Sequence, residues 1–361
     1  MQKAGAQPIR VLVVDDTPAM RELLVAILQS AEGIQVVGVG FNGLDAVRLA
    51  KRLRPDVVTM DIVMPQMDGL EATRHIMREA PTRIVIVTGR LMRTGEDLTF
   101  EALRAGALTV IGKPGLADPE TCSRVVQTVR LMSDVPVVHR WGNRSRRSTP
   151  ARPVAPPIPL DVDGRQGVQL IGIAASTGGP AALAAVLRPL PACFPVPILV
   201  VQHITRGFTT GLAEWLDGET ALRVGLADHG DVPSSGTALL APDDYHLQVN
   251  AQGSIELCKE QSYKGLRPSA NYLFRSMARA YGPRAMGIVL TGMGDDGAEG
   301  LKALHQAGGL TVAQDEGSCV VYGMPREAVI HKAVTRMLTP AQIAVTLCQL
   351  ARHEKKVASD G

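Results

Sequence analysis

The sequence is poor in aromatic residues, which make up 3% of its 361 positions although 45% are hydrophobic. The cores must therefore be built mainly from valine, leucine, isoleucine, alanine and methionine. The five cysteines are odd in number, widely spaced and without a Cys-x-x-Cys pair. This usage is typical of reduced thiols in a cytosol and gives no cysteine metal site.

Net charge and long hydrophobic runs are also scarce. A formal charge of +3 is too small to favour nucleic acid or an acidic membrane as the main partner. No apolar run approaches the roughly 18 residues of a membrane span, and the N-terminal MQKAGAQPIR lacks the apolar core of a signal peptide. We therefore expect a cytoplasmic protein without membrane insertion.

Length and composition predict two globular domains joined by a linker. The segment between about 134 and 167 contains six prolines and six arginines, and its apolar residues show almost no helical or strand periodicity. We interpret this segment as an extended, semi-rigid linker, which is either a solvated tether or a docking or regulatory segment. The expected organisation is a first domain at 9–132, the linker at 133–167, a second domain at 168–352 and a polar tail at 353–361.

The first domain alternates short apolar runs with amphipathic helical stretches. The apolar runs indicate parallel strands buried on both faces, and the stretches between them repeat Leu and Val at helical spacing. Five such units predict a flavodoxin-like (βα)5 sheet, with strand order 2-1-3-4-5 and ligands at the carboxyl ends of the strands. The predicted strands are 11–14, 34–39, 56–60, 83–87 and 107–111.

Three acids follow the first and third of these strands. Asp15 and Asp16 come directly after the first strand and Asp61 directly after the third, and these strands are neighbours in the predicted order. Clustered carboxylates repel one another, and a hard cation such as Mg²⁺ relieves that repulsion. Because Thr88 and Lys113 follow strands four and five, a phosphoryl group on Asp61 would meet a metal, a hydroxyl and an ammonium. For a lone acid such as Asp16, capping of the next helix is the simpler alternative.

The second domain repeats the alternation and predicts a second doubly wound, mostly parallel α/β sheet. In LIGIAASTGGPAALAAVL, Ser176 lies between an apolar strand and a helix, and Gly178 and Gly179 permit a tight turn. A serine there faces unpaired backbone N–H groups, which suit a nucleophile and an anion-binding loop equally. The predicted strands lie within 168–176, 195–203, 237–242, 285–292 and 308–314.

Two further strand ends supply partners for a serine nucleophile. His203 ends the run PILVVQ, and Asp295 and Asp296 follow AMGIVL. A serine nucleophile needs a histidine to take its proton, and the imidazole needs a carboxylate to orient it. One sheet edge can gather all three residue types, but these arguments do not choose between the two aspartates.

The segments VLVVDDTPAMR, TMDIVMPQMDGL, VIVTGR and IGKP resemble response-regulator receiver domains. The resemblance implies that a sensor histidine kinase phosphorylates Asp61 and that Asp15 and Asp16, with Asp61, hold Mg²⁺. It also implies that Thr88 and Lys113 read the phosphoryl group.

Two local features of the fifth strand bear on this resemblance. By analogy with the family, the bond between Lys113 and Pro114 is expected to be cis. Receivers commonly carry an aromatic residue three positions before the lysine, and this chain has Val110 there. The substitution departs from the aromatic switch of the family.

The segments ASTGGP, VVQH, LTGMGDDGAEG and AQDEGSCVVYGMPREAV resemble the catalytic domain of the chemotaxis protein-glutamate methylesterases. The resemblance implies Ser176 as nucleophile, His203 as base and Asp296 as orienting acid. It also implies that the Met293 N–H helps to form the oxyanion hole, that Thr177 supports the site, and that ester hydrolysis needs no cofactor.

The implied activity is phosphorylation-activated hydrolysis of glutamate γ-methyl esters, with deamidation of specific glutamines, on cytoplasmic helices of methyl-accepting chemoreceptors. One departure is Leu266, which stands where the family usually has the histidine of His-Arg-Pro-Ser. Two alternatives remain: a chemosensory-like regulator of a non-motility pathway, and an anion-binding module without turnover.

Overall fold

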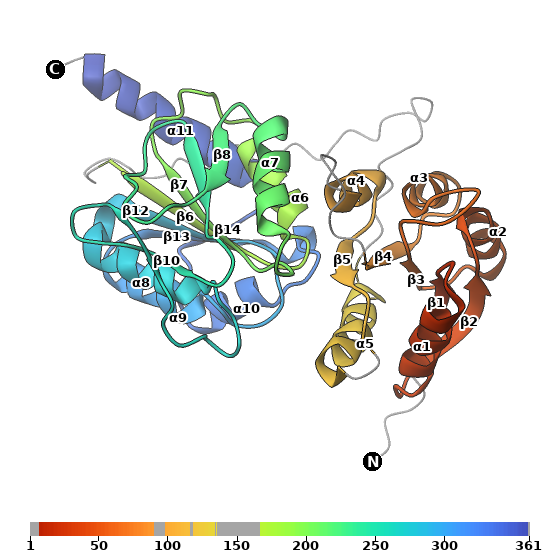
Figure 1. Cartoon of the computed structure of the whole chain (residues 1–361). Helices are drawn as coiled ribbons and strands as arrows, with labels where there is room; N and C mark the ends of the chain where they lie inside the picture. The colour runs from red at the N-terminus through yellow and green to blue at the C-terminus, as the bar shows by residue number, and fades with distance from the viewer. Residues whose placement is uncertain (1–6, 90–97, 116–117, 134, 136–166, 360–361) are drawn as a thin grey trace. The chain divides into compact units, whose positions relative to one another are not determined.

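The computed structural model describes residues 7–89, 98–115, 118–133, 135 and 167–359 (Figure 1). The chain divides into an N-terminal unit, Met1–Arg147, and a C-terminal unit, Ser148–Gly361. Most of the Pro- and Arg-rich segment at 133–167 lies outside the described residues, so its interpretation as a linker stays a prediction. Among the described residues, no helix combines the length and apolar character needed to cross a membrane.

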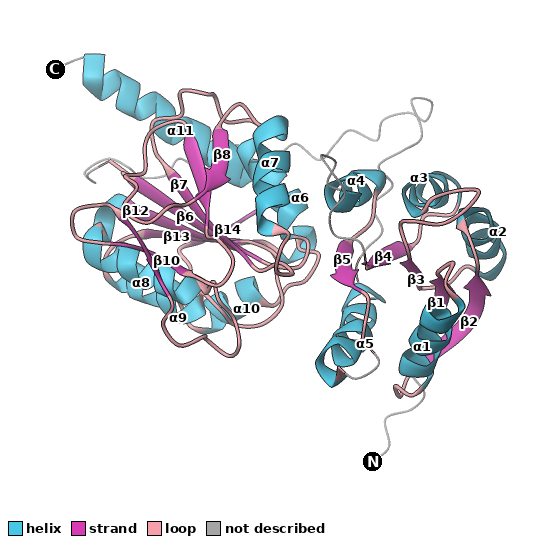
Figure 2. Cartoon of the chain, viewed as in Figure 1, coloured by secondary structure: helices cyan, strands magenta, loops and turns pink. Residues whose placement is uncertain are grey.

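The described part of the N-terminal unit is a five-stranded parallel sheet in the order β2-β1-β3-β4-β5. Helices α1 and α5 cover one face, and α2, α3 and α4 cover the other (Figures 1 and 2). The elements are β1 (Ile9–Val14), α1 (Pro18–Gln29), β2 (Ile34–Gly40), α2 (Gly43–Leu53), β3 (Val57–Met60), α3 (Gly69–Glu79), β4 (Arg83–Thr88), α4 (Leu98–Ala105), β5 (Thr109–Gly112) and α5 (Pro119–Ser133).

The observed strand order confirms the predicted flavodoxin-like sheet. Strand β3 is buried along its whole length, as expected for a parallel strand covered by helices on both faces. Val110 is partly buried and packs against the core. The prediction of a cis bond before Pro114 is wrong, because the cis peptide bond among the described residues joins Arg267 to Pro268.

In the C-terminal unit, the described residues form a seven-stranded parallel sheet in the order β14-β13-β12-β6-β7-β9-β8, with a separate antiparallel hairpin, β10-β11. The strands are β6 (Leu170–Ala175), β7 (Ile198–Gln202), β8 (Arg223–Leu226), β9 (Thr237–Leu240), β10 (His246–Val249), β11 (Ile255–Cys258), β12 (Ala285–Val289), β13 (Leu310–Gln314) and β14 (Arg336–Leu338). Its helices are α6 (Gly179–Leu187), α7 (Thr209–Glu219), α8 (Ala270–Ala280), η1 (Gly282–Arg284), α9 (Ala298–Gln306), η2 (Glu316–Ser318), α10 (Met324–Ile330) and α11 (Pro340–Ser359).

The five strands predicted for this unit are present as β6, β7, β9, β12 and β13, and the parallel sheet confirms the predicted class. Strands β8, β10, β11 and β14 were missed because each is short and lacks an apolar run. Helix α11 continues to Ser359, so it includes most of the expected polar tail. The few aromatics include two fully buried side chains of this unit, Phe194 and Phe274.

Parallel pairing determines where the functional residues lie. Strand β6 pairs with β12 on one side and with β7 on the other, all in the same direction. The loops that follow these three strands therefore begin at one edge of the sheet, which is the edge where doubly wound folds place their ligands.

In the N-terminal unit, a close backbone contact at Gly69 leads to a prediction about stability. A Cβ at Gly69 would lie 1.9 Å from the carbonyl oxygen of Asp61, whereas a Cβ at Gly112 would meet nothing within 4 Å. We expect Gly69→Ala to lower the free energy of unfolding by about 1–3 kcal/mol, because backbone atoms have to shift. Gly112→Ala is the matched control. Thermal unfolding followed by circular dichroism tests this, and equal melting temperatures for the two variants would contradict it.

Candidate functional site

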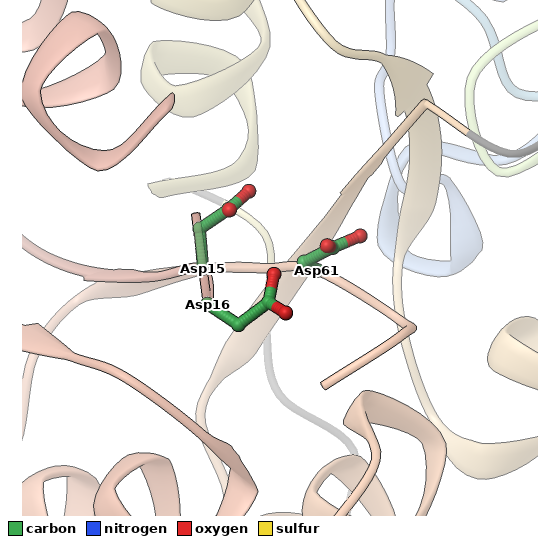
Figure 3. Close-up of side chains that lie close together, drawn as sticks. All are labelled: Asp15, Asp16 and Asp61. Atoms are coloured by element: carbon green, nitrogen blue, oxygen red, sulfur yellow. The ribbon is translucent and has the colours of Figure 1, made fainter. Parts of the chain in front are cut away.

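Three carboxylates meet at the carboxyl edge of the N-terminal sheet (Figure 3). One oxygen from each of Asp15, Asp16 and Asp61 lies within 4.8 Å of the others. Asp15 and Asp61 are buried and Asp16 is exposed. The Asp61 N–H donates to the carbonyl of Val14 at 3.0 Å, so the ends of β3 and β1 are aligned.

Lys113 lies between the two buried acids. Its Nζ is 2.7 Å from Asp15 Oδ2 and 2.8 Å from Asp61 Oδ2. Its backbone N–H donates to the carbonyl of Thr88, whose side chain is buried. The structure thus places all five residues predicted for this site at one edge of the sheet.

Burial and mutual contacts shift the pKa values of Asp61 and Lys113. Burial raises the pKa of Asp61, and the neighbouring Asp15 charge adds to the increase, while the ammonium of Lys113 opposes it. Burial also disfavours the Lys113 ammonium, but its hydrogen bonds to Asp15 and Asp61 prevail and raise the pKa of Lys113. Three close carboxylate oxygens are the ligands that Mg²⁺ prefers, so the residues present fit that ion.

Ser176 begins the loop between β6 and α6 in the C-terminal unit. Its N–H donates to the Thr291 carbonyl at 3.0 Å, and its carbonyl accepts from the Gly179 N–H at 2.8 Å. Gly178 has a φ of 77°, and a Cβ there would meet Val320 at 2.5 Å. The turn that presents Ser176 therefore requires glycine at 178.

His203 is held beside this loop by backbone and side-chain contacts. Its N–H donates to the Ala175 carbonyl at 2.9 Å. The buried Gln202 amide donates to both the Ser176 carbonyl and the His203 carbonyl, each at 2.8 Å. One side-chain nitrogen therefore ties the backbones of the two loops together.

Asp296 is buried against His203. Its Oδ2 lies 2.9 Å from His203 Nε2 and accepts from the Ala270 N–H at 2.7 Å. Its Oδ1 accepts from the Ser269 hydroxyl at 2.6 Å and from the Asn271 N–H at 3.3 Å. Burial alone would raise the pKa of Asp296, but its contacts with His203, Ser269 and Ala270 outweigh burial and hold it below its ordinary value.

The two adjacent aspartates occupy different environments. Asp295 is partly exposed and pairs with Lys264 at the surface, whereas Asp296 faces the imidazole. Asp296 thus lies at the Nε2 side of the His203 ring.

The loop after β12 carries Met293 to the edge of the sheet where Thr177 follows β6. A Cβ at Gly292 would lie 2.7 Å from Ser176 Cβ, so this loop runs directly against the serine. Met293 follows and is 45% exposed. The Thr177 carbonyl accepts from the Thr291 hydroxyl at 2.9 Å, which joins the two loops.

Sequence reasoning missed three residues that organise this edge, namely Gln202, Ser269 and Thr291. Gln202 precedes His203 and reads as the last residue of an apolar strand. Ser269 precedes an amphipathic helix, and that position is a recognisable N-cap signal. The contact of its hydroxyl with Asp296 connects residues far apart in the chain and has no local signal.

Comparison with known proteins gives the same division of the chain. The family model described as response regulator receiver domain matches residues 11–125, and the model described as CheB methylesterase matches 171–347. Protein-glutamate methylesterase/protein-glutamine glutaminase 4 of Myxococcus xanthus is 50% identical over 88% of this chain and 90% of its own length. Protein-glutamate methylesterase/protein-glutamine glutaminase 1 of Syntrophus aciditrophicus is 45% identical over 95% of this chain and 98% of its own length. The crystal structure of the Thermotoga maritima CheB methylesterase catalytic domain aligns with a TM-score of 0.50 and 34% identity, covering 51% of this chain and all of that one.

The different surroundings of Asp295 and Asp296 predict different effects on stability. The pKa of Asp296 is lowered in the folded state, so its stabilising effect is present above the unfolded-state pKa and is lost as pH falls through the folded-state pKa. We expect Asp296→Asn to lower the free energy of unfolding by about 1–3 kcal/mol at pH 7, and by progressively less on acidification. Asp295→Asn, at an exposed pair, should change it by less than about 1 kcal/mol. Urea unfolding from pH 7 down to about pH 2 tests this, and a loss that stays the same below about pH 4 would contradict it.

Proposed function

The chain belongs to the protein-glutamate methylesterase/protein-glutamine glutaminase family, with a receiver domain before the catalytic domain, and we propose that Ser176, His203 and Asp296 carry its reaction. The substrates that we propose are glutamate γ-methyl esters on cytoplasmic helices of chemoreceptors, which places the protein in the cytoplasm. The observation that supports these roles best is the pairing of His203 with the buried Asp296 beside the Ser176 loop.

The proposed reaction starts with attack of Ser176 Oγ on the ester carbonyl carbon, while His203 Nδ1 takes the hydroxyl proton. The negative charge that develops on the carbonyl oxygen is met by the Met293 N–H. His203 returns the proton to the leaving oxygen, so methanol departs and an acyl-enzyme remains. Water, deprotonated by the same imidazole, then attacks the acyl-enzyme to release glutamate and regenerate Ser176.

Asp296 supports both half-reactions by holding His203. Its buried carboxylate faces Nε2 and stabilises the imidazolium that forms each time His203 accepts a proton. The same steps convert a glutamine side chain to glutamate, with ammonia as the leaving group in place of methanol. None of these steps uses a cofactor.

In the N-terminal unit, we assign Asp61 as the phosphoacceptor for a sensor histidine kinase. Asp15, Asp16 and Asp61 would hold Mg²⁺, which neutralises charge on the phosphoryl oxygens when it is bound. Lys113 already contacts Asp61 and can transfer its ammonium contact to a phosphoryl oxygen. Thr88 ends the adjacent strand and supplies a hydroxyl at the same edge. Phosphorylation adds about two negative charges there and thereby controls the esterase.

The nucleophile assignment is tested by Ser176→Ala. Loss of a triad nucleophile lowers kcat on the order of 10⁶-fold, so methanol release from a methylated receptor fragment should fall to background. Ser235→Ala is the matched control. Ser235 lies just before β9, at the opposite end of the sheet from Ser176, and its hydroxyl donates to the Pro195 carbonyl. If Ser176→Ala keeps a tenth of the wild-type rate, the serine mechanism is wrong. If the wild-type protein releases neither methanol nor ammonia, an anion-binding role is favoured.

Control by phosphorylation is tested by Asp61→Asn. This variant should hydrolyse ester near the resting rate and show no increase with a small phosphodonor and Mg²⁺, because it lacks the acceptor carboxylate. Asp68→Asn is a suitable control, because Asp68 caps α3 through its side chain and asparagine caps helices equally well. Activation that survives in Asp61→Asn but not in Asp68→Asn would overturn the assignment.

A further inference from the structure

We propose that Ser269 is a positioning residue for ester hydrolysis, whose hydroxyl holds the Asp296 carboxylate in the orientation that faces His203. The inference rests on the proposed role of Asp296 and assigns a further residue to the same reaction. Ser269 is fully buried, so it acts through Asp296 and does not touch the substrate.

The Ser269 hydroxyl makes two hydrogen bonds at the start of α8. It donates to Asp296 Oδ1 at 2.6 Å and accepts from the Asn271 N–H at 3.3 Å. The residue is the N-cap of the helix, with extended backbone angles of −127° and 133°. Its rotamer is therefore determined from both sides, by the helix that it caps and by the carboxylate that it holds.

The start of α8 completes the binding of Asp296. The Ala270 N–H donates to Oδ2, and the Asn271 N–H donates to Oδ1. A carboxylate at this position is also favoured by the positive end of the helix dipole. Without the Ser269 hydroxyl, Oδ1 would keep a single, longer hydrogen bond, and the carboxylate could turn Oδ2 away from His203.

The backbone of Ser269 is itself held by His246. The Ser269 N–H donates to His246 Nδ1 at 3.1 Å, and His246 Nε2 lies 3.3 Å from the Gln261 carbonyl. The His246 ring stacks on Tyr272, with centroids 3.8 Å apart and planes 17° apart. Burial lowers the pKa of His246, so the ring stays neutral near pH 7 and keeps Nδ1 as an acceptor.

Several charged or titratable side chains surround Asp296, and they bear on any pH measurement. Those on the neighbouring elements are His203, His246, Tyr263, Lys264, Arg267 and Asp295. Lys264 and Asp295 neutralise each other at the surface. Removing the neutral Ser269 hydroxyl changes none of these charges. A shift in the pH dependence of kcat/KM would therefore report a changed contact between Asp296 and His203.

The test compares ester hydrolysis by Ser269→Ala and Ser276→Ala in the full chain. Ser276 is a matched control because it lies on the same helix, is equally buried, and bonds the Leu273 carbonyl and the Val249 N–H, not Asp296. In Ser269→Ala, we expect kcat to fall roughly 10- to 100-fold with KM unchanged. A carboxylate that has turned away from His203 stabilises the imidazolium less, so the acid limb of kcat/KM should move down by roughly 0.5 pH unit.

Ser269→Gly provides a second variant, because glycine is tolerated at an N-cap and also lacks the hydroxyl. It should show the same shift of the acid limb. If the acid limbs of both Ser269 variants coincide with that of Ser276→Ala while Ser176→Ala is inactive, the positioning role is wrong and the proposed function stands. If Ser176→Ala remains active, the proposed function itself fails.

Discussion

Parallel strand pairing is the constraint on which both sites depend. Parallel neighbours end at the same edge of a sheet, so residues far apart in sequence meet there without any contact between their own segments. In the N-terminal unit, β1 and β3 bring Asp15 and Asp61 together. In the C-terminal unit, β6 lies between β7 and β12, and the loops that follow carry Ser176, His203 and Asp296. The same geometry thus builds two chemically different sites in one chain.

The two sites treat a buried carboxylate in opposite ways. Asp61 is surrounded by other acids and has Lys113 as its main counter-charge, so burial prevails and its pKa is raised. Asp296 receives three hydrogen bonds and faces an imidazole, so those contacts prevail and its pKa is lowered. In the roles proposed above, Asp61 needs an oxygen that can accept a phosphoryl group, whereas Asp296 only has to orient His203.

Both sheets and the edge of each site could be predicted from the sequence, because apolar runs identify buried strands and polar residues directly follow them. That is why Ser176 and His203 stand out. Asp296 lies further along its loop and could be separated from Asp295 only by family resemblance, whereas the structure separates them by burial. The role proposed for Ser269 could not be predicted, since it depends on how α8 packs against the loop after β12. A cis bond was predicted before Pro114 but occurs before Pro268, because the local sequence does not determine which X–Pro bond is cis in the folded protein.

The double hydrogen bond of Gln202 has a consequence for motion. Because one amide nitrogen holds the carbonyls of Ser176 and His203, local opening of either loop removes a restraint from the other. Ser176 and His203 therefore belong to one cooperative unit of local unfolding, although they lie on separate loops. Fluctuations that break these hydrogen bonds in one loop therefore also weaken a restraint on the other loop.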